Sequence, residues 1–154
     1  MSSRSTTRLE LLDGVKTALQ TRFNASTGTV RKLFRDLYRG PVRPIVTGRP
    51  VCGVADGGQR RGEDGDRTGA SNGRVVTVLV TCHIDADWEK VNPARDWTQY
   101  VEEIIEALDG NLTVGAGLIE LNYVSDDPVE IVFAAGESEA AWVLTFEAVR
   151  FVDY

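Results

Sequence analysis

The chain has 154 residues, of which 42% are hydrophobic and 26% charged, so it is long enough to bury the core of one domain without disulfide support. The net charge of −6 combines a basic first third with an acidic remainder, because residues 1–50 hold ten Arg and Lys against three Asp and Glu, and residues 51–154 hold seven against twenty. This acidic excess argues against a general nucleic-acid-binding protein, and no segment approaches the roughly 20 apolar residues of a membrane span.

The uneven charge has two interpretations. Both ends could simply be solvated, or the basic and acidic parts could contact other copies of the chain or other proteins. The N-terminus lacks the apolar segment of a signal peptide, and the two cysteines, Cys52 and Cys82, are too few for a disulfide framework. We therefore expect a soluble chain from a reducing cytoplasm, in which the two thiols could meet only if their strands are neighbours.

A first helix is predicted from a cap at Ser5, Thr6 or Thr7 to about Phe23. Its apolar residues recur at helical spacing and should form one buried stripe. The expected stripe consists of Leu9, Leu12, Val15, Leu19 and Phe23.

The segment TVRKLFRDLYRG, residues 29–40, predicts a second, basic amphipathic helix that ends at Gly40 and Pro41. Such a helix is commonly an ordinary surface helix whose cationic stems cover apolar area, although it can also bind an acidic partner or a membrane surface. The apolar residues are Val30, Leu33, Phe34, Leu37 and Tyr38. The basic residues, which we expect at an interface with another subunit or the tube, are Arg31, Lys32, Arg35 and Arg39.

Prolines at 41, 44 and 50 predict an extended passage into a short edge strand over residues 51–55. Residues 56–73 hold six glycines and no large apolar side chain, which predicts a polar loop at the tip of a long protruding β-hairpin. Its interleaved charges suit a protein contact better than a grip on nucleic acid. We expect this loop, spanning about 55–74, to reach a neighbouring subunit through Arg60, Arg61, Glu63, Asp64, Asp66 and Arg67.

The second strand of the hairpin, residues 74–84, alternates in a way that places Val76, Val78, Val80, Cys82 and Ile84 on one face. A helix is predicted over Asp96–Asp109, with Gly110 as its stop and an acidic outer side. Its apolar stripe should cover that strand face and comprises Trp97, Tyr100, Val101, Ile104, Ile105 and Leu108.

The remaining chain predicts short strands around residues 119–123 and 129–133, separated by a turn at Ser125–Pro128, and a last strand that starts near Trp142. The whole plan is α+β: a mixed, largely antiparallel sheet of four to five strands with helices packed on it, in one domain spanning 1–154.

Candidate chemistry is sparse. His83, Asp85 and Asp87 alternate, so in a strand all three would project from one face and could form part of a divalent-metal site of a small hydrolase. The motif is short, His83 is the sole histidine, and no phosphate-binding pattern occurs. We therefore expect no catalytic residue, no metal and no cofactor, and keep the metal-dependent hydrolase as the alternative from a different class.

The order of these segments resembles the tail terminator proteins of long-tailed bacteriophages. The similar pieces are TRLELLDGVKTAL, RPVCGVADGG, RVVTVLVTCHI, DWTQYVEEIIEALDG and WVLTFEAVRFVDY, whereas residues 26–43 depart from the pattern. The resemblance implies a non-enzymatic virion protein that is assembled in the host cytoplasm. It also implies a ring, usually of six copies, that ends polymerisation of the tail tube and joins it to the head connector while DNA passes without specific binding. A head–tail connector or tail-completion protein of similar fold is the nearest alternative.

Overall fold

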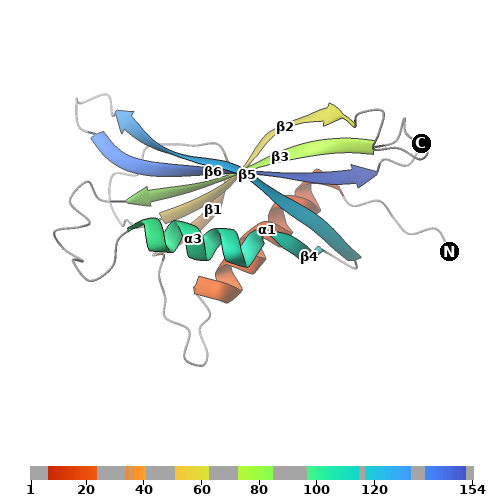
Figure 1. Cartoon of the computed structure of the whole chain (residues 1–154), viewed down its shortest axis with the longest axis horizontal. Coiled ribbons are helices and arrows are strands. Elements are labelled where there is room, and N and C mark those ends of the chain that lie inside the picture. The colour runs from red at the N-terminus through yellow and green to blue at the C-terminus, as the bar shows by residue number, and fades with distance from the viewer. Residues whose placement is uncertain are drawn as a thin grey trace.

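The computed structural model of the chain describes residues 7–23, 34, 36–40, 51–62, 73–84, 97–114, 117–132 and 138–151 (Figure 1). Two helices lie within these residues, and neither is long and apolar enough to cross a bilayer. The elements in chain order are α1 (Arg8–Phe23), β1 (Asp36–Arg39), β2 (Val51–Arg61), β3 (Gly73–Ile84), α3 (Trp97–Leu108), β4 (Gly110–Val114), β5 (Gly117–Val132) and β6 (Ser138–Phe151).

The described strands form one sheet in the order β1-β2-β3-β6-β5-β4. Only β1 and β2 run parallel, and every other described pair is antiparallel. The predicted α+β class and the mixed, mostly antiparallel sheet are therefore confirmed. The sheet has six described strands instead of four or five: the short edge strands β1 and β4 were not expected, and the two short strands predicted around 119–123 and 129–133 are one strand, β5. Both helices lie on the same side of the sheet (Figure 1).

Helix α1 begins as its sequence predicts, because the backbone N–H of Glu10 donates to Oγ1 of Thr7 at 3.1 Å. Its apolar stripe differs from the prediction at the N-terminal end, where Leu9 is 56% exposed. Leu11 lies two residues on, about 200° around the helix, and it contacts the core in place of Leu9. The buried residues, spaced by four, are Leu11, Val15, Leu19 and Phe23.

The core lies between the two helices and the facing side of the sheet. Val101, Ile104 and Leu108 of α3 are buried as predicted, whereas the side chains of Trp97 and Tyr100 lie outside the described residues. From β3 the predicted face contributes Val76, Val78, Val80 and Cys82. Gly110 ends the helix with a φ of +113°, in the left-handed region that favours glycine.

The predicted second helix is wrong over residues 36–39, which form β1. Leu37 enters the core and Tyr38 faces the other way, so these apolar residues are divided between the two faces of a strand. β1 pairs with β2 over Val51–Val54, and this long-range pairing overrides the local helical spacing. Residues 24–33 and 35, which carry the rest of that prediction, lie outside the described part of the chain.

β2 is longer than the predicted strand 51–55, and it is not an edge strand there, because β1 lies on one side and β3 on the other. It continues to Arg61 through an irregularity between Asp56 and Gln59. β6 pairs with β3 from Gly73 to Ile84, so the predicted hairpin is backed by a third strand along its length. The hairpin tip, residues 63–72, lies outside the described residues.

The predicted turn at Ser125–Pro128 is also wrong, because β5 runs without a break from Gly117 to Val132. Its pairing with β6 shifts by one residue between Tyr123 and Ser125, and the chain reverses only between Val132 and Ser138. β4 pairs with β5 only as far as Leu121, so β5 is an edge strand at Pro128 within the described sheet. A proline is tolerated there because an edge position requires no second backbone donor.

Candidate assembly surface

Three of the ten predicted interface residues can be placed: Arg39, Arg60 and Arg61. The other seven lie outside the described residues and are Arg31, Lys32, Arg35, Glu63, Asp64, Asp66 and Arg67. Arg39 belongs to β1, and its Nε lies 3.1 Å from Oδ1 of Asp13 on α1. Arg39 therefore links the sheet edge to the helix and is not part of a basic helix face.

Arg60 and Arg61 project from opposite faces of β2, because side chains alternate along a strand. Nη1 of Arg60 lies 3.2 Å from Oε1 of Glu147 on β6, and the two side chains are 49% and 34% exposed. An ion pair this exposed contributes about 0–1 kcal/mol, so it adds little to stability. It lies on the sheet face away from the helices and spans β3 diagonally.

Arg61 belongs to a row of three arginines that sequence reasoning missed. The strand register places it opposite Arg74 of β3, and Arg74 opposite Arg150 of β6. All three share the face on which the helices lie, since Arg74 alternates in phase with Val76 and Arg150 with Ala148. Each of the three is the last residue of its strand or the one next to a strand end, which the sequence pattern could have indicated. Only the strand register shows that they are neighbours. We call Arg61, Arg74 and Arg150 the arginine row.

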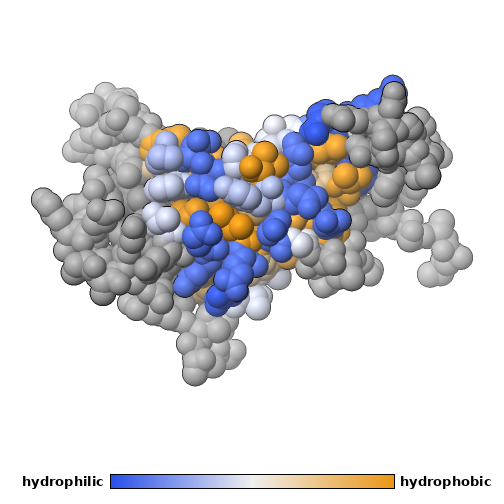
Figure 2. Space-filling view, in the orientation of Figure 1, coloured by the Kyte–Doolittle hydropathy of each residue, from blue (hydrophilic) through white to orange (hydrophobic). Residues whose placement is uncertain are grey.

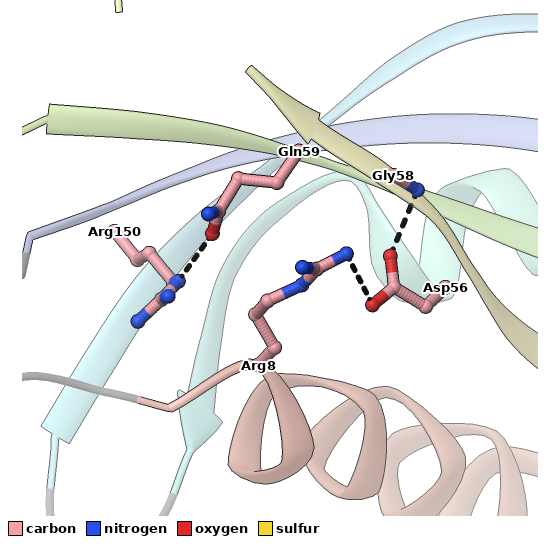
Figure 3. A network of polar contacts seen from close by, with 5 residues as sticks. All are labelled: Arg8, Asp56, Gly58, Gln59 and Arg150. Carbon is pink, nitrogen blue, oxygen red and sulfur yellow. Dashed lines mark hydrogen bonds and ion pairs between the residues drawn. The ribbon is translucent and has the colours of Figure 1, made fainter. Parts of the chain in front are cut away.

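Arg8, the first residue of α1, adds a fourth guanidinium beside this row. It forms an ion pair with Asp56 of β2, and Asp56 also accepts a hydrogen bond of 2.8 Å from the backbone N–H of Gly58 (Figure 3). Gly58 has a φ of +108°, which the irregularity in β2 requires and a side chain would strain. Close by, Nε of Arg150 donates to Oε1 of Gln59 at 2.7 Å.

The positive charges at this end of the sheet act on Asp56. Partial burial acts to raise its pKa, but hydrogen bonds from Arg8 and Gly58 and the charges of Arg8 and Arg150 outweigh that effect and hold the pKa below its ordinary value. A carboxylate with a lowered pKa stabilises the fold at neutral pH, and this contribution is lost as the pH falls through the folded-state pKa. Asp56 therefore remains ionised among the arginines under ordinary conditions.

A surface of opposite charge lies at the β5 edge, around the exposed side chain of Tyr123. The Tyr123 hydroxyl donates to Oδ2 of Asp126, and Nε1 of Trp142 donates to Oδ1 of the same carboxylate at 2.7 Å. Oδ1 of Asp109 accepts the backbone N–H of Tyr123 at 2.9 Å. We call this surface the acidic patch; its residues are Glu102, Asp109, Tyr123, Asp126 and Asp127.

The pKa of the Tyr123 hydroxyl reflects the negative charge of the acidic patch. The hydrogen bond to Asp126, desolvation and the negative charges of Asp126, Glu102 and Asp127 raise the pKa of Tyr123 to about 12. Tyr123 is 36% exposed and the neighbouring Val124 49%, so apolar surface lies within the patch. Figure 2 shows apolar and hydrophilic side chains interspersed over the described part of this view.

The candidate metal ligands are only partly placed. His83 is fully buried on the sheet face away from the helices, and its Nε2 lies 2.7 Å from the hydroxyl of Tyr38. Asp85 and Asp87 lie outside the described residues. Within the described ranges, no three His, Cys, Asp or Glu side chains are grouped as metal ligands would be. His83 thus contributes to the packing between β1 and β3.

The two cysteines face each other across neighbouring strands. Cys52 of β2 is the register partner of Cys82 of β3, and both are buried free thiols on the core face. A hydrogen bond with Cys82 and burial raise the pKa of Cys52 well above its ordinary value. Since the thiolate is the reactive form, the Cys52 thiol is unreactive in the folded protein, and burial shields both sulfurs from solvent.

Comparison with known proteins does not assign this chain to a family. No family model matches the sequence, and no curated protein matches it. Among solved structures, a chain from the virion of a native gene transfer agent particle has 18% sequence identity and a TM-score of 0.48, over 91% of this chain and 94% of that chain. A TM-score of 0.48 at 18% identity assigns neither a family nor a function to this chain.

Proposed function

We propose that the protein is a structural component of a phage-like virion, forming a ring at the head-proximal end of the tail tube. In this role it ends polymerisation of the tube and joins the tail to the head connector. The observation that carries the proposal is the presence of two surfaces of opposite charge, the arginine row and the acidic patch, at different places on one protomer. Copies that meet head to tail require two such unlike surfaces.

The order of elements also supports this role. The described chain runs from a capped helix through a β2–β3 hairpin and a helix to closing strands, which is the order on which the resemblance to tail terminators rests. We propose that the whole chain acts as one domain and that six copies close the ring. Residues 63–72 at the hairpin tip, including Glu63, Asp64, Asp66 and Arg67, would contact a neighbouring subunit or the tube.

Passage of DNA is compatible with the charge of the chain. A lumen through which DNA moves must not hold it, and carboxylates repel the phosphate backbone. The net charge of −6 supplies the required excess of negative groups. DNA would therefore pass the ring without specific binding.

Tube capping tests the proposal directly. Purified protein is added to polymerising tail tube protein from the same particle, and tube lengths are measured by negative-stain electron microscopy against tube protein alone. We expect shorter tubes with a ring of density at one end. Tubes that lengthen unchanged and carry no added density would contradict the role, and binding to isolated head connectors without binding to tubes would assign the protein to the connector class.

A further inference from the structure

We infer that the arginine row of one copy binds the acidic patch of a second copy, forming the contact that repeats around the assembly. The inference deepens the proposed function, on which it rests for the head-to-tail arrangement of copies. The charge imbalance of the sequence does not show which residues would form such a contact, whereas the arginine row and the acidic patch are two defined surfaces.

The arginine row is a concentrated positive surface. Its three side chains are register partners on adjacent strands, so they span only about 10 Å across the sheet. Like charges directly opposite each other across strands are destabilising. Arg61 is exposed, and Arg74 and Arg150 are half-buried, so the charges are only partly screened by water. An anionic surface placed over the row would relieve this repulsion, whatever local contacts each guanidinium makes.

Arg8 extends the same surface onto α1. Figure 3 shows Arg8, at the start of α1, directed at Asp56 of β2, and Arg150 of β6 directed at Gln59 of the same strand. The Nε atom of Arg8 is buried without a hydrogen-bond acceptor, although Nη2 of the same side chain pairs with Asp56. The surface therefore combines planar guanidinium groups from three strands and one helix, and such groups bind carboxylates in a bidentate manner.

The acidic patch has the chemistry that this surface would recognise. It presents carboxylates around an aromatic ring that is 36% exposed, with the 49% exposed Val124 beside it. Aromatic residues and arginine are enriched at protein interfaces, and a carboxylate that pairs with arginine adds a charge-assisted hydrogen bond. The edge of β5 at the patch carries an irregular register and Pro128, which disfavour strand addition. Binding through side chains is thus favoured over a continued sheet.

The two surfaces are separate on each protomer. Along β6, Arg150 lies four residues from Phe146 and six residues from Leu144, the register partners of Tyr123 and Asp126, which corresponds to about 13–20 Å. One copy can therefore use its row and its patch at the same time with two different neighbours. This is the requirement for a heterologous contact that repeats.

A second copy fits the row better than nucleic acid does. A duplex would have to approach a protein of net charge −6 through a positive surface only three strands wide. The acidic patch, by contrast, is present at the same concentration as the row in every solution of the protein.

Charge reversal with complementation tests the inference. Arg61→Glu with Arg150→Glu makes the row alternate in sign around Arg74, which should preserve the fold. Glu102→Lys with Asp127→Lys cancels the net negative charge of the patch by changing two exposed residues that accept none of the described hydrogen bonds from Tyr123 or Trp142. Lys16→Glu with Arg22→Glu on α1 is the matched control for the row variant, since both pairs of substitutions replace two cations by two carboxylates.

Sedimentation velocity up to about 1 mM protein measures self-association at about 0.1 M and about 1 M salt, where the Debye length falls from about 10 Å to about 3 Å. We expect the wild type and the α1 control to associate at low salt and to weaken at high salt. Each reversed variant alone should lose about tenfold or more in affinity. An equimolar mixture of the two reversed variants should regain association, since the unchanged arginine row of the patch variant then faces the unchanged acidic patch of the row variant.

Several results would overturn the inference: a wild type that stays monomeric at low salt, reversed variants that associate like wild type, or a mixture that fails to recover. Thermal melts of each variant separate unfolding from a lost contact. Fluorescence anisotropy with a DNA duplex tests nucleic acid as the alternative partner. The row would be assigned to nucleic acid if DNA bound tightly, if this binding were lost only in the row variant, and if the mixture did not regain association. Restored association without tube capping would support the contact and contradict the proposed function. Tube capping by both reversed variants would support the proposed function and contradict the contact.

Discussion

The contact between Gly53 and Tyr38 predicts a large effect from the smallest possible substitution. The Tyr38 ring lies over Gly53 of β2, and a Cβ at position 53 would lie 2.3 Å from Cζ, 2.5 Å from the hydroxyl oxygen and 2.7 Å from Cε2 of Tyr38. Tyr38 is only 7% exposed, and its hydroxyl lies 2.7 Å from Nε2 of the fully buried His83. The ring therefore cannot move away from Gly53→Ala without breaking a buried hydrogen bond.

Two opposing effects decide the size of the loss. Alanine in place of glycine in a strand reduces the entropy of the unfolded chain and favours folding by about 0.5–1 kcal/mol. Overpacking in a well-packed site costs about 1–3 kcal/mol, and a buried polar group left without its partner costs about 1–3 kcal/mol more. The net expectation for Gly53→Ala is a loss of about 2–4 kcal/mol, which lowers Tm by roughly 5–15 °C for a chain of this size.

Urea denaturation monitored by circular dichroism measures this loss, and a double-mutant cycle identifies its cause. In a Tyr38→Ala background the obstructing ring is absent, so adding Gly53→Ala should cost nothing or stabilise slightly. Gly57→Ala is the matched control on an exposed part of β2, because its Cβ would lie 2.9 Å from the Thr77 methyl, 3.2 Å from Cβ of Thr77 and 3.1 Å from Cγ of Leu79, without meeting an aromatic ring. Its loss of stability should therefore be smaller than that of Gly53→Ala. A Gly53→Ala protein as stable as wild type, or an equal loss in the Tyr38→Ala background, would refute the reasoning.

Three further predictions follow from single contacts. Thr7→Ala removes the N-cap of α1 and should lower the unfolding free energy by about 1 kcal/mol in urea melts, whereas Thr7→Ser should restore it. In an ultraviolet pH titration, Tyr123 should ionise only near pH 12, and Asp126→Asn should lower its pKa toward the ordinary value; the contribution of this hydrogen bond to stability is present below about pH 10 and is lost as the pH rises through the folded-state pKa. Cys52 and Cys82 should not react with a thiol reagent such as DTNB in the folded protein but should both react in urea, and fast labelling of native protein would contradict their burial.

Local sequence patterns predicted an element correctly where one face of that element packs against the core at a regular spacing. The alternation of Val76, Val78, Val80 and Cys82 identifies the core face of β3, and the spacing of Val101, Ile104 and Leu108 identifies the buried side of α3. Thr7 caps α1 and Gly110 ends α3 because these positions depend on backbone groups within a few residues. Each of these features follows from local chain geometry.

Local patterns failed where a distant strand decides the outcome. Leu37 and Tyr38 fit a helical spacing, but pairing with β2 makes the segment a strand. Ser125–Pro128 has the composition of a turn, yet the ladder with β6 keeps β5 extended through it. Tertiary hydrogen bonding outweighs propensities that differ by only about 1 kcal/mol per residue.

Composition and local periodicity predict the class of the fold, the two main helices, the central strand and the strong difference in charge between the first third and the rest. Where those charges gather depends on how distant strands pair. Arg61, Arg74 and Arg150 are far apart in the chain and become neighbours through the register of three strands, and Asp109 and Asp126 meet around Tyr123 through the packing of a helix end against β5. Register is set by pairing between distant segments, and a periodic pattern within one segment carries no information about its partner.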